Sequence, residues 1–312
     1  MTLTMDWISL QPVLVLLAAV FTARLPLFTS RFHPMRLLGL LFTSTADKVN
    51  NPKRSNKQHR IAGSLAIMTL IVFMLIALSI FRFIAIESII FDFLLLVCLL
   101  QWDNIKLTQI DLGNLEKPSI IEQLNDKTLR DLTQLSTLGL YKATIESLCL
   151  RNAYQWFAVV FWYTTLGIWA ATGYRIIQLM AHNWNCKLPN FQIFGRPAAL
   201  VLQLLTAPSH WLLGFTLSLF HQPVSSLSQG YRQTQQWHHK SGGFLLACFA
   251  NSLSVQLGGP RKYRGVMTRF SQLGSTNAPH KIDIKRCQQR LNFAAILWLT
   301  LLSTIYLFIA IK

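Results

Sequence analysis

The stretch from Ile61 to Phe81 reads IAGSLAIMTLIVFMLIALSIF and contains no charged side chain. A helix needs about 20 mainly apolar residues to cross the hydrocarbon core of a bilayer, which is about 30 Å thick. This stretch therefore predicts a membrane-spanning helix. A lipid bilayer is the first partner that the sequence predicts.

Five more apolar runs match the length of a membrane span or approach it. They are Trp7–Ala23, Ser88–Trp102, Ala153–Tyr174, Pro197–Phe220 and Leu291–Ile311. Ser88–Trp102 is short and carries Asp92, so the expected number of spans is five or six. Phe244–Leu257 is too short to cross and predicts a re-entrant or interfacial segment. The expected fold is all-α, a polytopic transmembrane helical bundle in a single domain over residues 1–312.

The composition agrees with a membrane protein and argues against two other classes. The 312 residues include 29 Lys and Arg against 12 Asp and Glu, which is a net charge of +17. Only 13% of the residues are charged, compared with roughly 25% in soluble domains. The 20 Phe and 9 Trp residues exclude a disordered chain. The charge alone would fit a nucleic-acid-binding protein, but the apolar runs argue against a nucleic-acid partner.

The basic residues are concentrated in two loops. Eight cations lie in Arg24–Arg60 against the single acid Asp47, and ten lie in Arg232–Arg290 against the single acid Asp283. Because cytoplasmic loops of membrane proteins carry an excess of Lys and Arg, we expect both loops on the cytoplasmic side. With six spans, this orientation places both termini outside and residues 103–151 in the cytosol.

Residues 103–151 differ in kind from the two basic loops. They hold seven acids and six bases, with apolar residues at helical spacing, as at Ile120 and Leu124. Gly113 and Pro118 would interrupt a continuous helix. The segment therefore predicts a cytosolic helical hairpin.

The sequence contains no self-sufficient catalytic or metal-binding motif. The Gly-x-x-x-x-Gly-Lys-Ser/Thr phosphate loop, the Gly-x-Ser-x-Gly elbow and the His-Glu-x-x-His pair do not occur. The five cysteines stand alone, so neither a disulfide framework nor a cysteine metal cluster is expected. The sequence leaves any metal ligand unknown, and three clusters of polar residues are the candidates for a functional site.

The first cluster is His33-Pro34-Met35-Arg36-Leu37-Leu38-Gly39, shortly after the first apolar run. Arg36 beside His33 is suited to hold a phosphate or a carboxylate, because a guanidinium offers paired donors. The alternative is an ordinary basic flank in which the proline begins a helix. The spacing alone does not separate the two interpretations.

The second cluster is Gln256-Leu257-Gly258-Gly259-Pro260-Arg261-Lys262-Tyr263. The paired glycines free backbone N–H groups to approach an anion, and Arg261 and Lys262 add positive charge. The alternative is a Gly-Gly-Pro turn that leaves a membrane-embedded helix. Both interpretations stay open.

The third cluster combines Arg130-Asp131 with Glu146, which lies shortly before the run Ala153–Tyr174. One interpretation of Glu146 is a base or a Mg²⁺ ligand at the membrane surface. The alternative is a helical ion pair with Lys142, four residues earlier.

Together these clusters resemble the CobD/CbiB family of cobalamin-biosynthesis membrane proteins. His33–Gly39 is similar to the family's His-Pro-Val-Arg-x-Ile-Gly, and Leu253–Pro260 is the most specific match. Further matches in chain order are Gly113–Glu116, Ala143–Ser147, Phe161-Trp162, Tyr174-Arg175 and Phe194-Gly195. The matching landmarks run from residue 33 to residue 265 and cover most of the chain.

The resemblance implies an amide-forming ligase of the bacterial inner membrane, an adenosylcobinamide-phosphate synthase. Such an enzyme joins aminopropanol or its phosphate to adenosylcobyric acid, a corrinoid, with ATP and Mg²⁺. Glu146 and Asp131 would then be the catalytic carboxylates, and the Gly258-Gly259 backbone would stabilise the anion of an acyl-phosphate route. The substrate- and phosphate-binding residues would be His33, Arg36, Arg130, Gln256, Gly258, Gly259, Arg261, Lys262 and Tyr263.

Several acids of the family pattern are replaced in this chain. Leu150, Tyr154, Ala181 and the pair Leu202-Gln203 stand where the family has acidic residues. Polar groups inside membrane proteins are usually functional, so this loss favours an alternative to catalysis. In that alternative the chain is a non-enzymatic relative, similar to the AmpE-type signalling proteins of the inner membrane.

Overall fold

The structure is a computed structural model that describes residues 7–25, 33–104, 117–125, 127–235, 237 and 239–311. Contacts between residues divide the chain into two compact units, and each is described by itself. Unit 1 comprises Met1–Trp102, Gln155–Leu205 and Leu297–Lys312, and unit 2 comprises Asp103–Tyr154 and Thr206–Ile296. The single domain expected over residues 1–312 stays a prediction.

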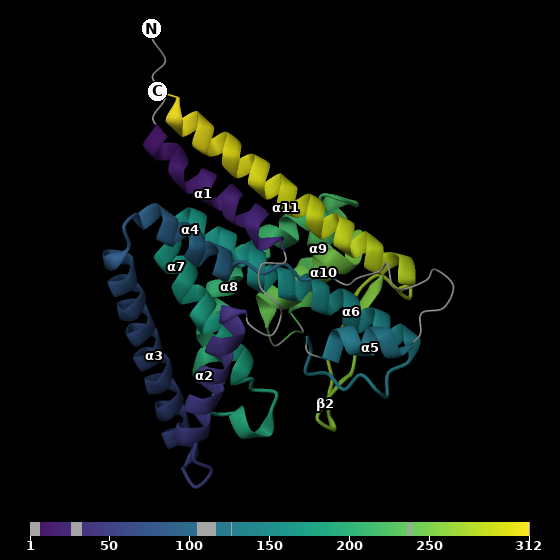
Figure 1. The fold of residues 1–312 in the computed structure, drawn as a ribbon. Coiled ribbons are helices and arrows are strands. Elements are labelled where there is room, and N and C mark those ends of the chain that lie inside the picture. The colour runs from purple at the N-terminus through teal and green to yellow at the C-terminus, as the bar shows by residue number, and fades with distance from the viewer. Residues whose placement is uncertain are drawn as a thin grey trace. The chain divides into compact units, whose positions relative to one another are not determined.

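Unit 1 is built from helices (Figure 1). They are α1 (Trp7–Ala23), α2 (Pro34–Val49), α3 (Asn56–Ile84), α4 (Ser88–Leu99) and α7 (Ala158–Asn183), the first part of α8 (Arg196–Ser218), the last part of α11 (Lys281–Ala310), and the short turns η2 (Ala153–Phe157, which begins in unit 2) and η3 (Pro189–Phe191). α2 begins at its proline, and the His33 side chain caps it by accepting from Met35 N at 3.2 Å. A capping box of Ser55 and Gln58 begins α3.

α7 is the central helix of unit 1, because α1, α2, α3 and α4 all pack against it. The Tyr163 hydroxyl of α7 donates to the Pro12 carbonyl oxygen of α1 at 3.1 Å. At Gly167 the backbone adopts a φ of 80° and a ψ of −171°, which breaks the helix into two pieces. Glycine adopts such a conformation without the steric conflict that a Cβ atom would cause.

Two glycines allow backbone segments of unit 1 to approach one another closely. A Cβ atom on Gly63 of α3 would lie 2.1 Å from the carbonyl oxygen of Phe194. One on Gly195 would lie 1.8 Å from the carbonyl oxygen of Trp184. The Trp184 indole is buried there and donates to the Phe42 carbonyl oxygen of α2 at 3.0 Å. These contacts hold α2, α3 and the start of α8 together.

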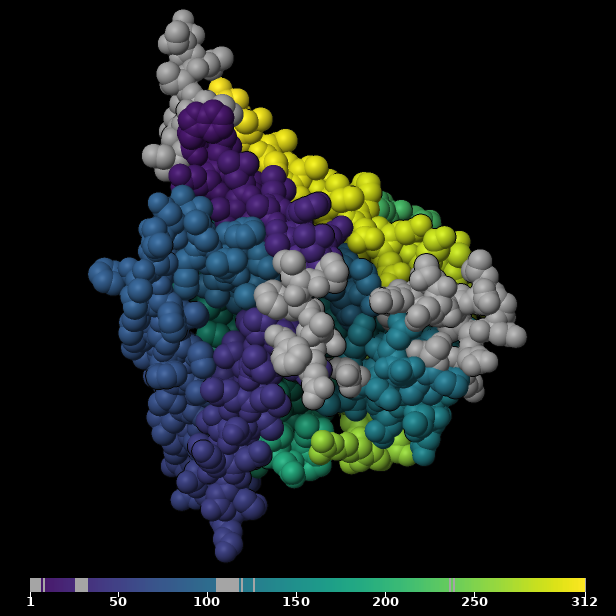
Figure 2. Space-filling model, viewed as in Figure 1, coloured from purple at the N-terminus to yellow at the C-terminus, as the bar shows by residue number. Residues whose placement is uncertain are grey.

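Three of the described helices, α3, α8 and α11, are long and apolar enough to cross a membrane. α3, in dark blue, lies at the surface in Figure 2 and exposes large apolar side chains such as Met68, Phe73 and Phe83. α1 and α4 are apolar but shorter. The predicted span Ala153–Tyr174 falls in η2 and α7, and α7 is not one of these three helices. The number of spans, five or six, therefore stays a prediction.

Unit 2 combines helices with four short strands. They are α5 (Lys117–Asn125), α6 (Thr137–Asn152), the last part of α8, α9 (Pro223–Thr234), α10 (Lys240–Leu253), the first part of α11, β1 (Gln256–Gly258), β2 (Arg261–Tyr263), β3 (Val266–Thr268) and β4 (Gln272–Gly274). Every residue of α10 from Ser241 to Leu253 is buried, and α6, α9, β1 and β4 pack against it. The segment Phe244–Leu257, predicted to be re-entrant or interfacial, forms most of this buried helix and continues into β1. Its position relative to a membrane stays a prediction. A short helix that is apolar on all sides is typical of a core.

The strands correct the all-α prediction locally, although the chain is mostly helical. β1 pairs antiparallel with β4, and β2 pairs antiparallel with β3. Arg264 and Gly265 connect β2 to β3 with φ values of 45° and 83°, the signs that a type I′ turn requires. Strands of three residues are too short to produce a recognisable hydrophobic period, so the sequence pattern did not reveal them.

The predicted hairpin in residues 103–151 is represented by α5 and α6, which pack against each other. Pro118 lies in the first turn of α5, where a missing N–H group costs no helical hydrogen bond. Gly113, the other predicted interruption, lies outside the described residues. The cytosolic location of the hairpin stays a prediction.

Candidate functional site

Glu146 of α6 is the centre of a polar cluster in unit 2, with only 4% of its surface exposed. The Gly258 N–H group donates to its Oε1 at 2.7 Å. Its Oε2 forms ion pairs with Arg130 Nη1 at 3.3 Å and with Arg261 Nη2 at 3.0 Å. The second and third clusters of the sequence therefore meet at one carboxylate.

Lys142 contributes to this cluster in a different way from the helical ion pair that the sequence offered. Its Nζ donates to Gln256 Oε1 at 2.8 Å, and among the described residues it forms no ion pair with Glu146. Gln256 Nε2 in turn donates to Gln272 Oε1 of β4 at 3.1 Å. Lys142 is only 9% exposed, so it is buried like Arg130 and Arg261. Three buried cations therefore lie around one buried carboxylate, and the cluster carries an excess of positive charge.

Aromatic rings hold the Arg261 guanidinium in place. Its central carbon lies 4.5 Å from the centre of the Phe270 ring and 5.0 Å from that of the Trp237 ring. Such cation–π contacts are strongest when the cation is shielded from water, and Arg261 is only 6% exposed. The Nε atoms of Arg130 and Arg261 are buried without an acceptor in the described part of the chain. Buried donors normally have an acceptor, so these N–H groups are suited to an anion.

The two arginines differ in their electrostatics. Burial lowers the pKa of Arg130, and the attraction of Glu146 only partly opposes it. Burial also acts to lower the pKa of Arg261, but the charge of Glu146 and the interactions with Glu146 and Tyr263, including hydrogen bonds, outweigh it, so the pKa is raised. The two pKa values therefore shift in opposite directions, although both arginines pair with Glu146.

Gly258 and Gly259 follow one another with φ values of 76° and 90°, a region that favours glycine. A Cβ atom on Gly258 would lie 2.4 Å from the Ser271 carbonyl oxygen. The sequence led us to expect that both N–H groups bind an anion. In the structure the Gly258 N–H group donates to Glu146, and the Gly259 N–H group donates to the Ser271 carbonyl oxygen at 3.4 Å. The donors left for an anion are therefore those of the arginine side chains.

Asp131 organises the β2–β3 hairpin. Its Oδ1 accepts from Arg264 N at 3.1 Å and its Oδ2 accepts from Gly265 N at 2.8 Å, the two residues of the turn. Its own N–H group donates to the Lys262 carbonyl oxygen at 2.9 Å. Asp131 therefore fixes the strand that carries Arg261.

The other two predicted residues of this strand, Lys262 and Tyr263, differ in environment. Tyr263 is buried and hydrogen-bonds to Arg261, so it belongs to the cluster around Glu146. Lys262 is half-buried, and its Nζ donates to Gln134 Oε1 at 2.9 Å.

Replacing Asp131 by alanine should loosen the β2–β3 turn, because the N–H groups of Arg264 and Gly265 lose a charged acceptor. Since these N–H groups lie near the surface, we expect amide hydrogen exchange in residues 263–266 to accelerate by about tenfold, with little change in α6. Asp131→Asn keeps one acceptor oxygen, so its exchange rate in these residues should lie between those of the Asp131→Ala protein and the unmodified protein. Exchange as slow as in the unmodified protein would contradict this role.

Glu146 and Asp131 do not fit a Mg²⁺ site as they are arranged. Magnesium binds carboxylate oxygens, but all four oxygens of these two residues already accept N–H groups or pair with arginine. Within the described ranges, no group of three or more His, Cys, Asp or Glu side chains is placed to hold a metal ion. We therefore assign no step to a metal ion held by these two carboxylates.

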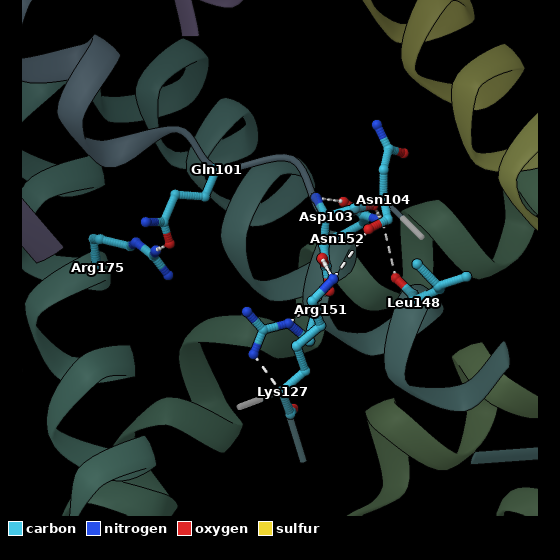
Figure 3. A network of polar contacts seen from close by, with 8 residues as sticks. All are labelled: Gln101, Asp103, Asn104, Lys127, Leu148, Arg151, Asn152 and Arg175. Carbon is cyan, nitrogen blue, oxygen red and sulfur yellow. Dashed lines mark hydrogen bonds and ion pairs between the residues drawn. The ribbon is translucent and has the colours of Figure 1, made fainter. Parts of the chain in front are cut away.

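His33 and Arg36, the first predicted cluster, lie in unit 1 and are described separately. The His33 ring contacts Gln101 Nε2 at 3.0 Å, and Gln101 Oε1 accepts from the fully buried Arg175 of α7 (Figure 3). Arg175 also donates to Gln178. Burial lowers the pKa of His33, and the charge of Arg175 adds to this effect. Arg36 lies exposed in the first turn of α2.

Figure 3 also shows a polar network of unit 2 around Asp103, which is 8% exposed. Its carboxylate accepts from Lys127 Nζ at 2.6 Å and from Arg151 Nε at 2.7 Å. The Asn152 side chain accepts from the backbone N–H of Asp103 at 2.8 Å and donates to its carbonyl oxygen at 2.9 Å. The network therefore ties the chain at residue 103 to the end of α6.

Asp103 and Arg175 are polar residues whose structural importance the sequence reasoning missed. Asp103 counted only as one of seven acids, and Arg175 only as part of a landmark. The signal that was available for Arg175 is its position just after a long apolar run, where a cation is costly unless it is bound by other groups.

These features define a class: a mostly helical protein with helices long enough to cross a membrane and with a buried arginine pair suited to an anion. Residues 15–291 match the model of the family described as CobD/Cbib protein. The chain belongs to the CobD/CbiB family, as the sequence motifs predicted.

Individual relatives are similar to the chain over about half of its length. A cobalamin biosynthesis protein CobD of Chromobacterium violaceum is 29% identical over 172 residues, which are 55% of each chain. A CobD protein of Stutzerimonas stutzeri is 27% identical over 55% of this chain and 57% of its own length. A CobD protein of Mycobacterium tuberculosis is 26% identical over 50% of this chain and 52% of its own length. The match thus spans about half the length of these relatives. No solved structure matches the chain significantly.

Proposed function

We propose that this protein is a membrane-bound enzyme of cobalamin biosynthesis that joins aminopropanol, or its phosphate, to adenosylcobyric acid through an amide bond. The family membership supports a role in cobalamin biosynthesis, since the relatives above are named cobalamin biosynthesis proteins. The three apolar helices support the location in a membrane, with the basic loops on the cytoplasmic side of a bacterial inner membrane.

The observation that carries the proposal is the buried arginine pair at Glu146. An amide ligase must bind a carboxylate and, if ATP activates that carboxylate, phosphate groups as well. Arg130 and Arg261 are buried, share one carboxylate and keep N–H donors without described acceptors. Guanidinium groups bind carboxylates and phosphates through paired N–H donors, and the protein interior strengthens the attraction.

In the proposed reaction, a carboxylate oxygen of the corrinoid attacks the terminal phosphorus of ATP, and ADP leaves. The amine of aminopropanol then attacks the acyl carbon, phosphate leaves, and the amine nitrogen loses a proton. Arg130 and Arg261 stabilise the oxygens that gain negative charge in both steps. Glu146 and Asp131 act as positioning residues in this scheme, because their oxygens are bound to the arginines and to the backbone.

Arg261→Ala should lower synthesis of adenosylcobinamide or its phosphate by about 10²- to 10³-fold, the usual effect of removing a donor to a developing oxyanion. The test is growth of a cell that lacks its own synthase and is supplied with cobyric acid, together with turnover in isolated membranes. Arg269→Ala is the matched control, because Arg269 lies in the same hairpin region but is exposed. Equal growth of the two variants would contradict the role of Arg261, and failure of the inserted, unmodified protein would reject the synthase function.

One observation favours a second candidate, a non-enzymatic regulatory relative of the AmpE type. The family's acidic positions are occupied by Leu150, Tyr154, Ala181 and Leu202-Gln203, and the carboxylates of Glu146 and Asp131 are both engaged. The same complementation experiment separates the candidates, since a regulator does not restore growth on cobyric acid.

A further inference from the structure

A pocket of about 440 Å³ lies in unit 1, where α2 ends and α3 begins. Its lining includes Asp47 and Asn50 at the end of α2, His59 in the first turn of α3, and the turn Pro189–Phe191. The loop between the two helices is at the bottom of the view in Figure 1. The volume is within the range of about 300–1,000 Å³ that small-molecule sites occupy. None of the functional residues discussed above lines this pocket.

The two helix ends at this pocket carry opposite partial charges. The C-terminus of α2 is the negative end of that helix, and Asp47 adds a full negative charge there. The Ala46 and Val49 carbonyl oxygens at this end already accept N–H groups. The N-terminus of α3 is a positive end, and the exposed Lys57 lies in its first turn. The site therefore suits a ligand that carries a cation and an anion a few bonds apart.

Hydrogen bonding determines what His59 offers to a ligand. The Asn50 amide nitrogen donates to the Asn190 carbonyl oxygen at 2.7 Å, so its Oδ1 is free to accept. His59 Nδ1 lies 2.8 Å from that Oδ1 and must be the donor. In the neutral ring the hydrogen is therefore on Nδ1, and Nε2 is an acceptor. An acceptor on a residue that lines the pocket suits an N–H donor of the ligand.

Asp47 supplies the second acceptor for a cationic group. Its side chain is exposed, and among the described residues it forms no ion pair. A carboxylate near the C-terminus of a helix is electrostatically unfavourable, and a bound cation relieves this repulsion. Phe191 also lines the pocket, and aromatic rings attract cations.

Three exposed cations lie close in sequence to the lining residues, and such cations suit a phosphate. Lys48 follows Asp47 in α2, Lys53 follows the lining residue Pro52, and Lys57 is the second residue of α3. α3 is 29 residues long and apolar enough to cross a membrane. If α3 crosses the bilayer, the pocket at its first turn lies at the level of the lipid headgroups.

We propose that this pocket binds a phosphorylated primary amine, the headgroup of phosphatidylethanolamine, with its ammonium on Asp47 and His59 and its phosphate on Lys53 and Lys57. A primary ammonium can donate to both acceptors, whereas the quaternary ammonium of phosphatidylcholine has no N–H group. Phosphatidylglycerol has no cation at all. This proposal is independent of the ligase reaction and of the cluster around Glu146.

The test uses the full-length protein in detergent, titrated with each of the three lipids and monitored by native mass spectrometry. We expect phosphatidylethanolamine to bind about tenfold more tightly than the other two, because it alone forms charge-assisted hydrogen bonds to Asp47 and His59. Asp47→Asn should remove most of this preference and leave phosphatidylglycerol binding unchanged or stronger. Lys53→Gln combined with Lys57→Gln should weaken the binding of all three lipids.

Glu87→Gln is the matched control, since Glu87 is also an exposed carboxylate of unit 1 and its side chain makes no capping hydrogen bond. It should bind phosphatidylethanolamine like the unmodified protein. Equal affinity for the three lipids, or an unchanged preference in Asp47→Asn, would overturn the proposal. Displacement of the lipid by O-phosphoethanolamine at a similar concentration would assign the pocket to a soluble amine phosphate and so reject the lipid.

Discussion

Replacing Glu146 by alanine is expected to destabilise unit 2 by about 3–5 kcal/mol, because it leaves Arg130 and Arg261 buried without their counter-ion. The Gly258 N–H group loses its acceptor at the same time. The loss should appear as a lower midpoint of thermal unfolding and as faster amide exchange in α6 and in residues 256–263. Exchange in α7 of unit 1 should change much less.

Two further variants make this expectation specific. Glu146→Gln keeps an acceptor for Gly258 but removes the charge, so it should retain part of the lost stability. Glu122→Ala removes an exposed carboxylate of α5 and should change stability by less than about 0.5 kcal/mol. If Glu146→Ala were as stable as Glu122→Ala, the buried ion-pair cluster would not be a stabilising feature of unit 2.

Gly195→Ala is the second substitution with a large expected effect. The new Cβ atom would lie 1.8 Å from the Trp184 carbonyl oxygen and 3.0 Å from that of Phe191, and both are backbone atoms that no side-chain rotation can move. We expect a loss of about 3 kcal/mol or more, since overpacking commonly costs about 1–3 kcal/mol even when side chains can adjust. Thermal unfolding of the protein in detergent measures the loss.

Gly173→Ala is the control for this substitution within the same unit. A Cβ atom there would meet nothing within 4 Å, and the residue lies inside α7. Alanine is the better helix former by about 1 kcal/mol, so the control should be neutral or slightly more stable. A Gly195→Ala protein as stable as the Gly173→Ala protein would show that the turn before α8 can shift without penalty.

The helices were largely predictable from the sequence, because each is encoded by residues that are neighbours in the chain. The apolar run at Ile61–Phe81 falls inside α3, and the run at Leu291–Ile311 falls largely inside α11. The environment of a helix was not predictable in the same way, because it depends on non-local contacts. Phe244–Leu257 is apolar, but whether such a helix faces lipid or other helices depends on the segments that pack against it, and here they bury it.

The candidate site was predictable only in part. Arg130 and Arg261 were identified as residues suited to anions, and Glu146 and Asp131 as candidate catalytic carboxylates. However, Glu146 and Asp131 take their roles from partners more than 100 residues away in the chain. The structure shows that Glu146 binds two arginines and a backbone N–H group, and that Asp131 binds a turn. Neither arrangement has a periodic pattern, since each joins segments with no regular spacing.

The sequence by itself determined that the protein is mostly helical, that it has helices of membrane-crossing length and that it belongs to the CobD/CbiB family. These properties follow from local hydrophobicity and from short motifs. Only the tertiary structure decided that Glu146 pairs with Arg130 and Arg261 rather than with Lys142, and that the Gly258 and Gly259 N–H groups are already engaged. The physical reason is that burial, and with it the strength of each charge interaction, depends on which distant segments fold together.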